Sequence, residues 1–162
     1  MKIRYVKIIA FFLVIGAYST LMPDASKAQA DSDNGGNFGI GLMLGEPTGI
    51  SVKSWNNDRS AFGIGAAWSL SGRNEAVHLH ADHLWHSWFE NVDTGRLAFY
   101  YGIGGRMIFA DDATAGVRTP LGLNFVFQNV PLDLFVEAVP ILDLTPDTEL
   151  AGNGAVGIRY YF

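Results

Sequence analysis

Apolar and polar residues alternate one by one along most of this 162-residue chain. Side chains with a period of two point to opposite faces of an extended strand, so each such segment has one apolar and one polar face. Eight segments show this alternation, and none has a convincing 3.6-residue period of an amphipathic helix. The segments cover residues 37–45, 48–55, 59–70, 75–88, 96–110, 117–128, 132–144 and 149–162.

Short runs of turn-forming residues separate the eight segments. These runs are GEPTG, NND, SGRN, NVDTG, DDATAG, NVP and TPD. Connections this short join each strand to its neighbour in antiparallel order. The predicted fold is therefore all-β, with eight antiparallel strands that run up and down around a closed β-barrel.

The apolar face of the segments is long and aromatic, whereas the opposite face carries glycines and charges of both signs. In the seventh segment, Leu134 and Val136 share one face, and Asp133 and Glu137 lie on the other. A strand that spans a membrane needs about ten residues, and a basic residue exposed to lipid at mid-depth costs about 2–4 kcal/mol. We therefore expect a transmembrane barrel with its apolar face toward lipid. A soluble ligand-binding barrel, with the apolar face inside, is an alternative.

The charged face is expected to line the inside of the barrel. An eight-stranded barrel is just wide enough for its own side chains to fill it, so opposite charges should pair there and plug the interior. Glu137 is expected to pair with at least one of Arg106, Arg118 and Arg159. The predicted interior charge network consists of Lys53, Asp82, Arg106, Arg118, Asp133, Glu137, Asp143 and Arg159.

The first 30 residues have the three-part layout of a secretory signal peptide. Basic residues come first, an apolar run covers residues 8–17, and the small-residue motif AQA predicts cleavage after Ala30. Residues 31–36 then form a short flexible leader, and residues 37–162 form the barrel. The chain contains no cysteine, so no disulfide stabilises it.

The charge of the predicted mature chain argues against nucleic acid as a partner. Four of the 11 basic residues and one of the 16 acidic residues precede Asp31, which leaves a net charge of −8. Nucleic-acid-binding proteins instead present basic surfaces. No motif in the chain indicates a cofactor.

The stretch VHLHADHLWHSW concentrates the histidines of the chain. His78, His80 and Asp82 share one face of the strand, where a third strand could complete a metal site. The spacing matches no established zinc motif, so we expect these side chains to take part in interior hydrogen bonds and predict no metal site. His83 falls on the outward face together with Trp85.

His86 and Ser87 are an adjacent histidine and serine, and they are the candidate catalytic pair if the protein is an enzyme. A serine nucleophile needs its histidine within hydrogen-bond reach, but neighbouring residues on a strand point to opposite faces. In the outer-membrane deacylase of lipid A, a His-x-Ser arrangement lies on the lipid face. The stretch HSW does not resemble it, because its histidine and serine are adjacent. We therefore predict no enzymatic activity and keep a lipid A-modifying enzyme as a less favoured alternative.

The last segment, AVGIRYYF, carries apolar residues at alternate positions up to Phe162. It resembles the closing strand of bacterial outer-membrane proteins, and the eight-segment pattern is similar to the transmembrane domain of outer membrane protein A and its small relatives. This resemblance implies a location in the outer membrane, contact with outer-membrane lipid, and recognition of Ile158, Tyr160 and Phe162 by the barrel-assembly machinery. We expect a monomer. No tethering to the cell wall is implied, because no segment resembles the peptidoglycan-binding domain of outer membrane protein A.

Together these observations predict a small integral outer-membrane barrel with a charged and largely plugged interior. Its expected role is structural or accessory. The alternative is a narrow ion-conducting pore that the same charged residues would line, because they face the interior in either case.

Overall fold

The computed structural model describes residues 36–46, 48–69, 76–89, 94–110 and 113–162, and within these ranges every element is a β-strand. The predicted signal peptide and residues 31–35 of the leader lie outside this part of the chain. The described part includes no helix that is long and apolar enough to cross a membrane. The strands are β1 (Phe38–Glu46), β2 (Gly49–Asn57), β3 (Ser60–Ser69), β4 (Ala76–Trp88), β5 (Gly95–Phe109), β6 (Thr114–Arg118), β7 (Leu121–Phe127), β8 (Leu132–Thr145) and β9 (Glu149–Tyr161).

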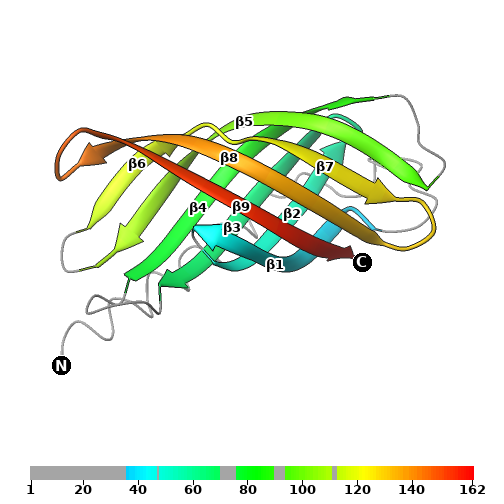
Figure 1. Ribbon diagram of the computed structural model, residues 1–162, viewed down its shortest axis with the longest axis horizontal. Helices are drawn as coiled ribbons and strands as arrows, with labels where there is room; N and C mark the ends of the chain where they lie inside the picture. The colour runs from blue at the N-terminus through cyan, green and yellow to red at the C-terminus, as the bar shows by residue number, and fades with distance from the viewer. Residues whose placement is uncertain (1–35, 47, 70–75, 90–93, 111–112) are drawn as a thin grey trace.

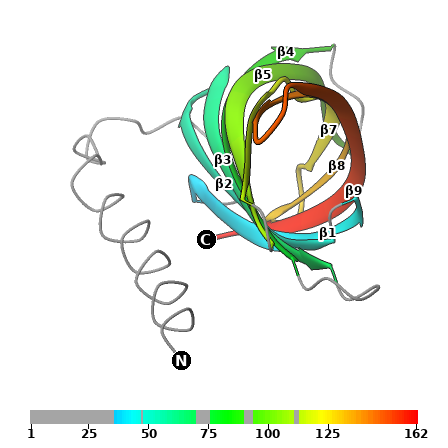
Figure 2. The same ribbon diagram turned by 90° about the vertical axis from the view of Figure 1, so that its left-hand side faces the viewer.

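The nine strands form one antiparallel sheet that closes on itself as a ring of eight strands (Figures 1 and 2). β4 pairs with both β3 and β5, and β1 pairs with β2 on one side and β9 on the other. The closing pair joins the two ends of the described chain, with Ile40 opposite Tyr160. The predicted all-β antiparallel architecture is therefore confirmed, and the membrane location stays a prediction.

One predicted strand, residues 117–128, is divided into β6 and β7. Both pieces lie between β5 and β8, so nine strands occupy eight positions in the ring. The division falls at Thr119 and Pro120, because proline has no N–H to donate to the ladder. The surrounding backbone remains paired: Thr119 N donates to Pro140 O at 3.0 Å, and Gly102 N donates to Pro120 O at 2.9 Å.

The alternating faces have the predicted orientation, with charges inside the ring and large apolar side chains outside. On β8, Asp133 and Asp143 are buried, whereas Leu134 and Val136 are 42% and 46% exposed. A shift of the strand by one residue would reverse both faces, so this pattern fixes the register.

The interior also holds an apolar layer that the sequence reasoning did not anticipate. Phe135 lies between Asp133 and Glu137 along β8, so this layer separates two groups of charged residues. Its members pack as one cluster of buried side chains. They are Met43, Ala67, Leu84, Tyr100, Phe135 and Ala155.

Two glycines let aromatic rings of this layer lie close against the wall. Gly122 is opposite Tyr100 on the neighbouring strand, and a Cβ atom there would stand 2.6 Å from the Tyr100 Cζ atom. Gly157 is opposite Phe135, and its Cβ would stand 2.4 Å from that ring. Larger residues at these two positions would collide with the rings that fill the interior.

Candidate functional site

The eight charged residues predicted to line the interior all point into the ring. Seven of them are buried, and the side chain of Glu137 is 12% exposed. Four are basic and four are acidic, so the set is balanced in charge. The residues are Lys53, Asp82, Arg106, Arg118, Asp133, Glu137, Asp143 and Arg159.

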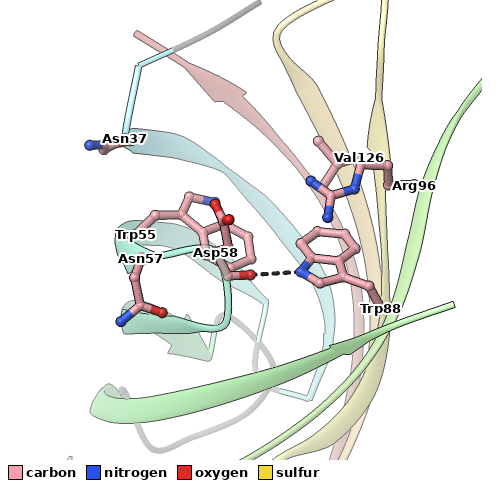
Figure 3. Close-up of a pocket in the computed structure, with 7 residues that line it drawn as sticks. All are labelled: Asn37, Trp55, Asn57, Asp58, Trp88, Arg96 and Val126. Carbon is pink, nitrogen blue, oxygen red and sulfur yellow. Dashed lines mark hydrogen bonds between the residues drawn. The ribbon is translucent and has the colours of Figure 1, made fainter. Parts of the chain in front are cut away.

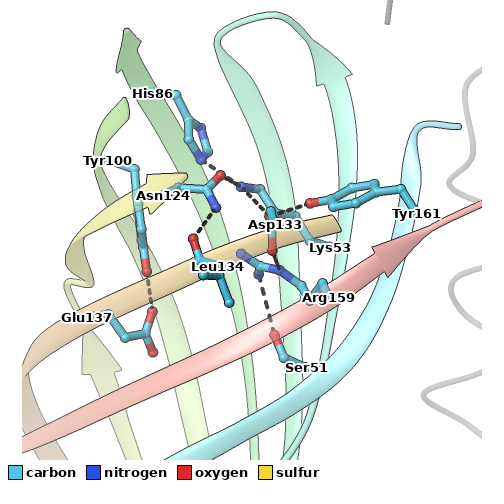
Figure 4. Close-up of polar contacts among 10 residues, drawn as sticks. All are labelled: Ser51, Lys53, His86, Tyr100, Asn124, Asp133, Leu134, Glu137, Arg159 and Tyr161. Carbon is cyan, nitrogen blue, oxygen red and sulfur yellow. Dashed lines mark hydrogen bonds and ion pairs between the residues drawn. The ribbon is translucent and has the colours of Figure 1, made fainter. Parts of the chain in front are cut away.

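Lys53 is fully buried and has three polar partners around its ammonium group (Figure 4). Its Nζ atom lies 2.8 Å from His86 Nε2, 2.9 Å from Asn124 Oδ1 and 3.9 Å from Asp133 Oδ2. These partners come from β4, β7 and β8. One lysine on β2 therefore connects four strands inside the ring, through two hydrogen-bond contacts and one ion pair.

Asp133 is the carboxylate shared by two buried cations. One cation is Lys53, and the other is Arg159, whose Nε donates a 2.9 Å hydrogen bond to Asp133 Oδ1. The Tyr161 hydroxyl donates a 2.8 Å hydrogen bond to Asp133 Oδ2. Arg159 Nη1 also lies 3.4 Å from Ser51 Oγ. The aspartate thus accepts charge-assisted bonds, the stronger class of hydrogen bond.

A second group of charges surrounds Glu137. Its Oε2 atom accepts a 2.8 Å hydrogen bond from the Tyr100 hydroxyl, and its Oε1 atom lies 3.3 Å from Arg118 Nη2. Arg118 Nε lies 3.1 Å from Asp82 Oδ1, and His80 Nε2 lies 3.9 Å from Asp82 Oδ2. The expectation that Glu137 pairs with an arginine is confirmed, and the partner is Arg118.

Arg106 and Asp143 form a separate pair. The guanidinium contacts both carboxylate oxygens, with Nε 2.9 Å from Oδ1 and Nη2 2.5 Å from Oδ2. Two-point contacts of this kind hold both groups in one geometry. Arg106, which the sequence offered as a possible partner of Glu137, pairs with this other carboxylate of β8.

Stacked aromatic and basic groups continue from the Lys53 cluster to one end of the ring. Lys53 Nζ lies 4.0 Å from the centre of the Trp55 ring, and Trp55 stacks on Trp88 at 5.9 Å between ring centres. The Arg96 guanidinium lies 4.1 Å from the Trp88 ring, and Trp88 Nε1 donates a 2.6 Å hydrogen bond to Asp58 O. Trp55, Asp58, Trp88 and Arg96 border a pocket of about 80 Å³ (Figure 3).

The histidines of β4 divide between the two faces as predicted. His86 is buried beside Lys53, while Ser87 is exposed on the other face, so these neighbours cannot act as a pair. His83 lies outside and stacks on Trp85 at 4.5 Å between ring centres. Within the described residues, no three His, Cys, Asp or Glu side chains are placed to hold a metal ion.

Sequence reasoning missed several uncharged members of the network. Each of them lies an even number of residues from a charged residue of its own strand, so the two share a face. The pairs are Tyr100 with Arg106, His86 with Asp82, and Tyr161 with Arg159. Alternation therefore contained the signal that these side chains face inward. It did not indicate which of them would meet, because that depends on the register of the neighbouring strands.

The three residues named for the assembly signal lie outside on β9 and at its end. Ile158, Tyr160 and Phe162 are 42%, 47% and 67% exposed. Their recognition by an assembly machinery stays a prediction.

Comparison of the chain with models of protein families, with curated proteins and with solved structures finds no match.

Proposed function

We propose that this chain is an eight-stranded, up-and-down transmembrane β-barrel of the bacterial outer membrane. The observation that carries the proposal is the polarity of the two faces of the ring. Lys53 and Asp133 are fully buried inside, whereas Leu42, Ile103 and Val156 are 61%, 53% and 51% exposed outside. A soluble protein of this size rarely exposes so continuous an apolar surface, and lipid would cover it.

Closure of the ring supports the same proposal. In lipid, no water satisfies backbone N–H and C=O groups, so a sheet can span a membrane only if it has no open edge. β1 and β9 are paired along both strands, with partners from Gly39 opposite Tyr161 to Glu46 opposite Gly154. A spanning sheet needs this continuous pairing.

We further propose that the interior acts as an electrostatic plug and that the role of the barrel is structural or accessory. The buried ion pairs connect strands of the ring from within: two of them join neighbouring strands, and the Arg106–Asp143 pair joins β5 to β8. The apolar layer fills the space between the charged groups. Freely diffusing solutes would have to displace both. The narrow ion-conducting pore is the competing function, because it requires the same charges to separate and leave a passage.

Two measurements test the proposal. Cell fractionation should recover the protein in the outer-membrane fraction, in a form whose electrophoretic mobility changes on heating; recovery in the soluble periplasm would refute the membrane location. Planar-bilayer recordings of the purified protein should show no steady channel steps. Regular conductance steps that change when Arg106 is replaced would establish the pore and overturn the plug.

A further inference from the structure

A polar cluster lies on the outside of the ring among aromatic side chains. Ser60 Oγ of β3 and His83 Nε2 of β4 are 2.9 Å apart, and Asn56 Nδ2 of β2 donates to Ser60 Oγ at 3.3 Å. Ser60 and His83 are half-buried, so both remain partly open to the surroundings. The pair is absent from the interior charge network and has no part in the proposed plug.

The strand register creates this cluster. Ser60 is opposite Trp85, and Phe62 is opposite His83, so Ser60 and His83 are diagonal neighbours on one face. The pairing of β2 with β3 is irregular between Trp55 and Asn57, which is where Asn56 lies. Irregularities of this kind redirect a side chain, and here the Asn56 amide reaches the serine.

Two aromatic rings pack against His83. The centre of its ring lies 4.7 Å from that of Phe62 and 4.5 Å from that of Trp85, and the Trp85 ring is only 18° from parallel with it. Contacts with two rings restrict rotation of the imidazole, so Nε2 stays directed at Ser60. A histidine held in this way meets the positional requirement for a general base.

We propose that Ser60 is an activated nucleophile toward acyl esters of lipids, with His83 as its general base. The lipid class follows from the proposed membrane location, on which this inference rests. A hollow of about 180 Å³ adjoins His83, the base of the pair, and Phe62, Ile64 and Ala81 also contribute to its lining. The short Ala81 side chain leaves space between larger outward residues, where the first part of an acyl chain fits.

The reaction is transfer of the acyl group to serine followed by hydrolysis. Ser60 Oγ bonds to the ester carbonyl carbon while its proton passes to His83 Nε2, and the bond to the alcohol oxygen breaks as that oxygen takes the proton. The Asn56 N–H lies beside the reacting centre and can donate to developing negative charge. Water, activated in turn by His83, then releases the fatty acid and restores the serine.

A fluorophosphonate probe tests the nucleophile directly. The purified full chain in detergent micelles should gain one adduct, and peptide mapping should place it on Ser60. Ser60→Ala should abolish the adduct, and His83→Phe, which keeps an aromatic ring but removes the base, should slow labelling by about 100-fold. Ser87→Ala is the matched control, because Ser87 is an exposed serine of the neighbouring strand whose adjacent histidine faces inward.

Release of fatty acid from phospholipid in mixed micelles is the second readout. The unaltered chain and Ser87→Ala should release fatty acid at the same rate, and Ser60→Ala should release none above the lipid alone. The inference is overturned if folded protein gains no adduct on Ser60, if His83→Phe labels at the unaltered rate, or if no fatty acid appears. The mobility shift on heating confirms folding of each variant.

The outcomes also separate this inference from the membrane proposal. Labelling in detergent does not require insertion into a membrane. If the protein is recovered from the periplasm and its Ser60 is still labelled, the nucleophile proposal stands and the membrane location is refuted. An outer-membrane protein whose Ser60 is inert would leave the barrel proposal standing and refute the nucleophile.

Discussion

Arg118 and Glu137 form an ion pair inside the ring, with 3.3 Å between Nη2 and Oε1. Glu137 also accepts a hydrogen bond from Tyr100, and Arg118 reaches Asp82 through its Nε atom. One glutamate and one arginine thereby connect β4, β5, β6 and β8. Because Arg118 is 2% exposed, loss of a carboxylate partner would leave buried charge poorly compensated.

Replacing Glu137 by alanine should destabilise the folded protein by about 3–5 kcal/mol. The physical cause is the buried Arg118 guanidinium, which among the described residues would keep Asp82 as its one acidic partner. The measurement is urea unfolding in lipid vesicles, read from the shift of the transition midpoint. Leu134→Ala is the control, because Leu134 lies on the outside of the same strand and should shift the midpoint much less. An unchanged midpoint for Glu137→Ala would contradict the role of the pair.

Arg106 and Asp143 allow a double-mutant cycle, because they contact each other at two points. Arg106→Met and Asp143→Leu should each destabilise the protein by about 3–5 kcal/mol, since each leaves one buried charge unpaired. The double variant should recover most of that loss, because apolar side chains replace the whole pair. A double variant whose losses simply add would show that the two residues are not energetically coupled.

Strand alternation was sufficient to predict the faces of the ring. On β8, a one-residue slip would bring Asp133 and Glu137 to the outside, so only one register is compatible with an apolar exterior. The same reasoning placed Arg118 and Arg159 inside, and Arg118 is the partner of Glu137. Short turns predicted that consecutive strands are neighbours.

Alternation could not predict contacts that depend on how neighbouring strands are aligned. Ser60 and His83 are 23 residues apart, and they meet because Ser60 is opposite Trp85. The Trp55–Trp88 stack likewise depends on the relative heights of β2 and β4. Pro120 itself indicated a possible interruption of the strand, since proline cannot donate to the ladder. The alternation of apolar and polar residues continues across Pro120, however, so the sequence was interpreted as one strand.

Lys53 provides a chemical test of the proposed plug. It is the only lysine after residue 30, and its side chain is fully buried. An amine-reactive ester should modify it far more slowly in the folded protein than in urea, because reaction requires opening of the structure. Intact-mass measurement over time follows the modification, and peptide mapping separates Lys53 from the α-amino group.

Trp55→Ala should accelerate this modification in the folded protein. The Trp55 ring lies 4.0 Å from Lys53 Nζ and separates it from the pocket at the end of the ring. Trp68→Ala is the matched control, because Trp68 is 45% exposed on the outside of β3 and should leave the rate unchanged. Rapid modification of Lys53 without any substitution would favour the open pore over the plug.

Two glycine-to-alanine substitutions test whether aromatic rings set the fit of the interior. At Gly122 the added methyl group would stand 2.4 Å from Val136 O and 2.6 Å from the Tyr100 ring, so the wall or the ring must move. Overpacking of this kind should destabilise the protein by about 1–3 kcal/mol, and movement of Tyr100 would also weaken its hydrogen bond to Glu137.

At Gly152, which is exposed on β9, the methyl group would meet no atom closer than 4.0 Å. Alanine in a strand is favoured over glycine by roughly 0.5–1 kcal/mol, so Gly152→Ala should be neutral or slightly stabilising. Urea unfolding of both variants under identical conditions gives the comparison. The opposite signs follow from the two faces of the wall: inside, rings occupy the space above the glycine, whereas outside that space is open. Equal effects of the two substitutions would show that Tyr100 does not pack against Gly122 as the structure places it.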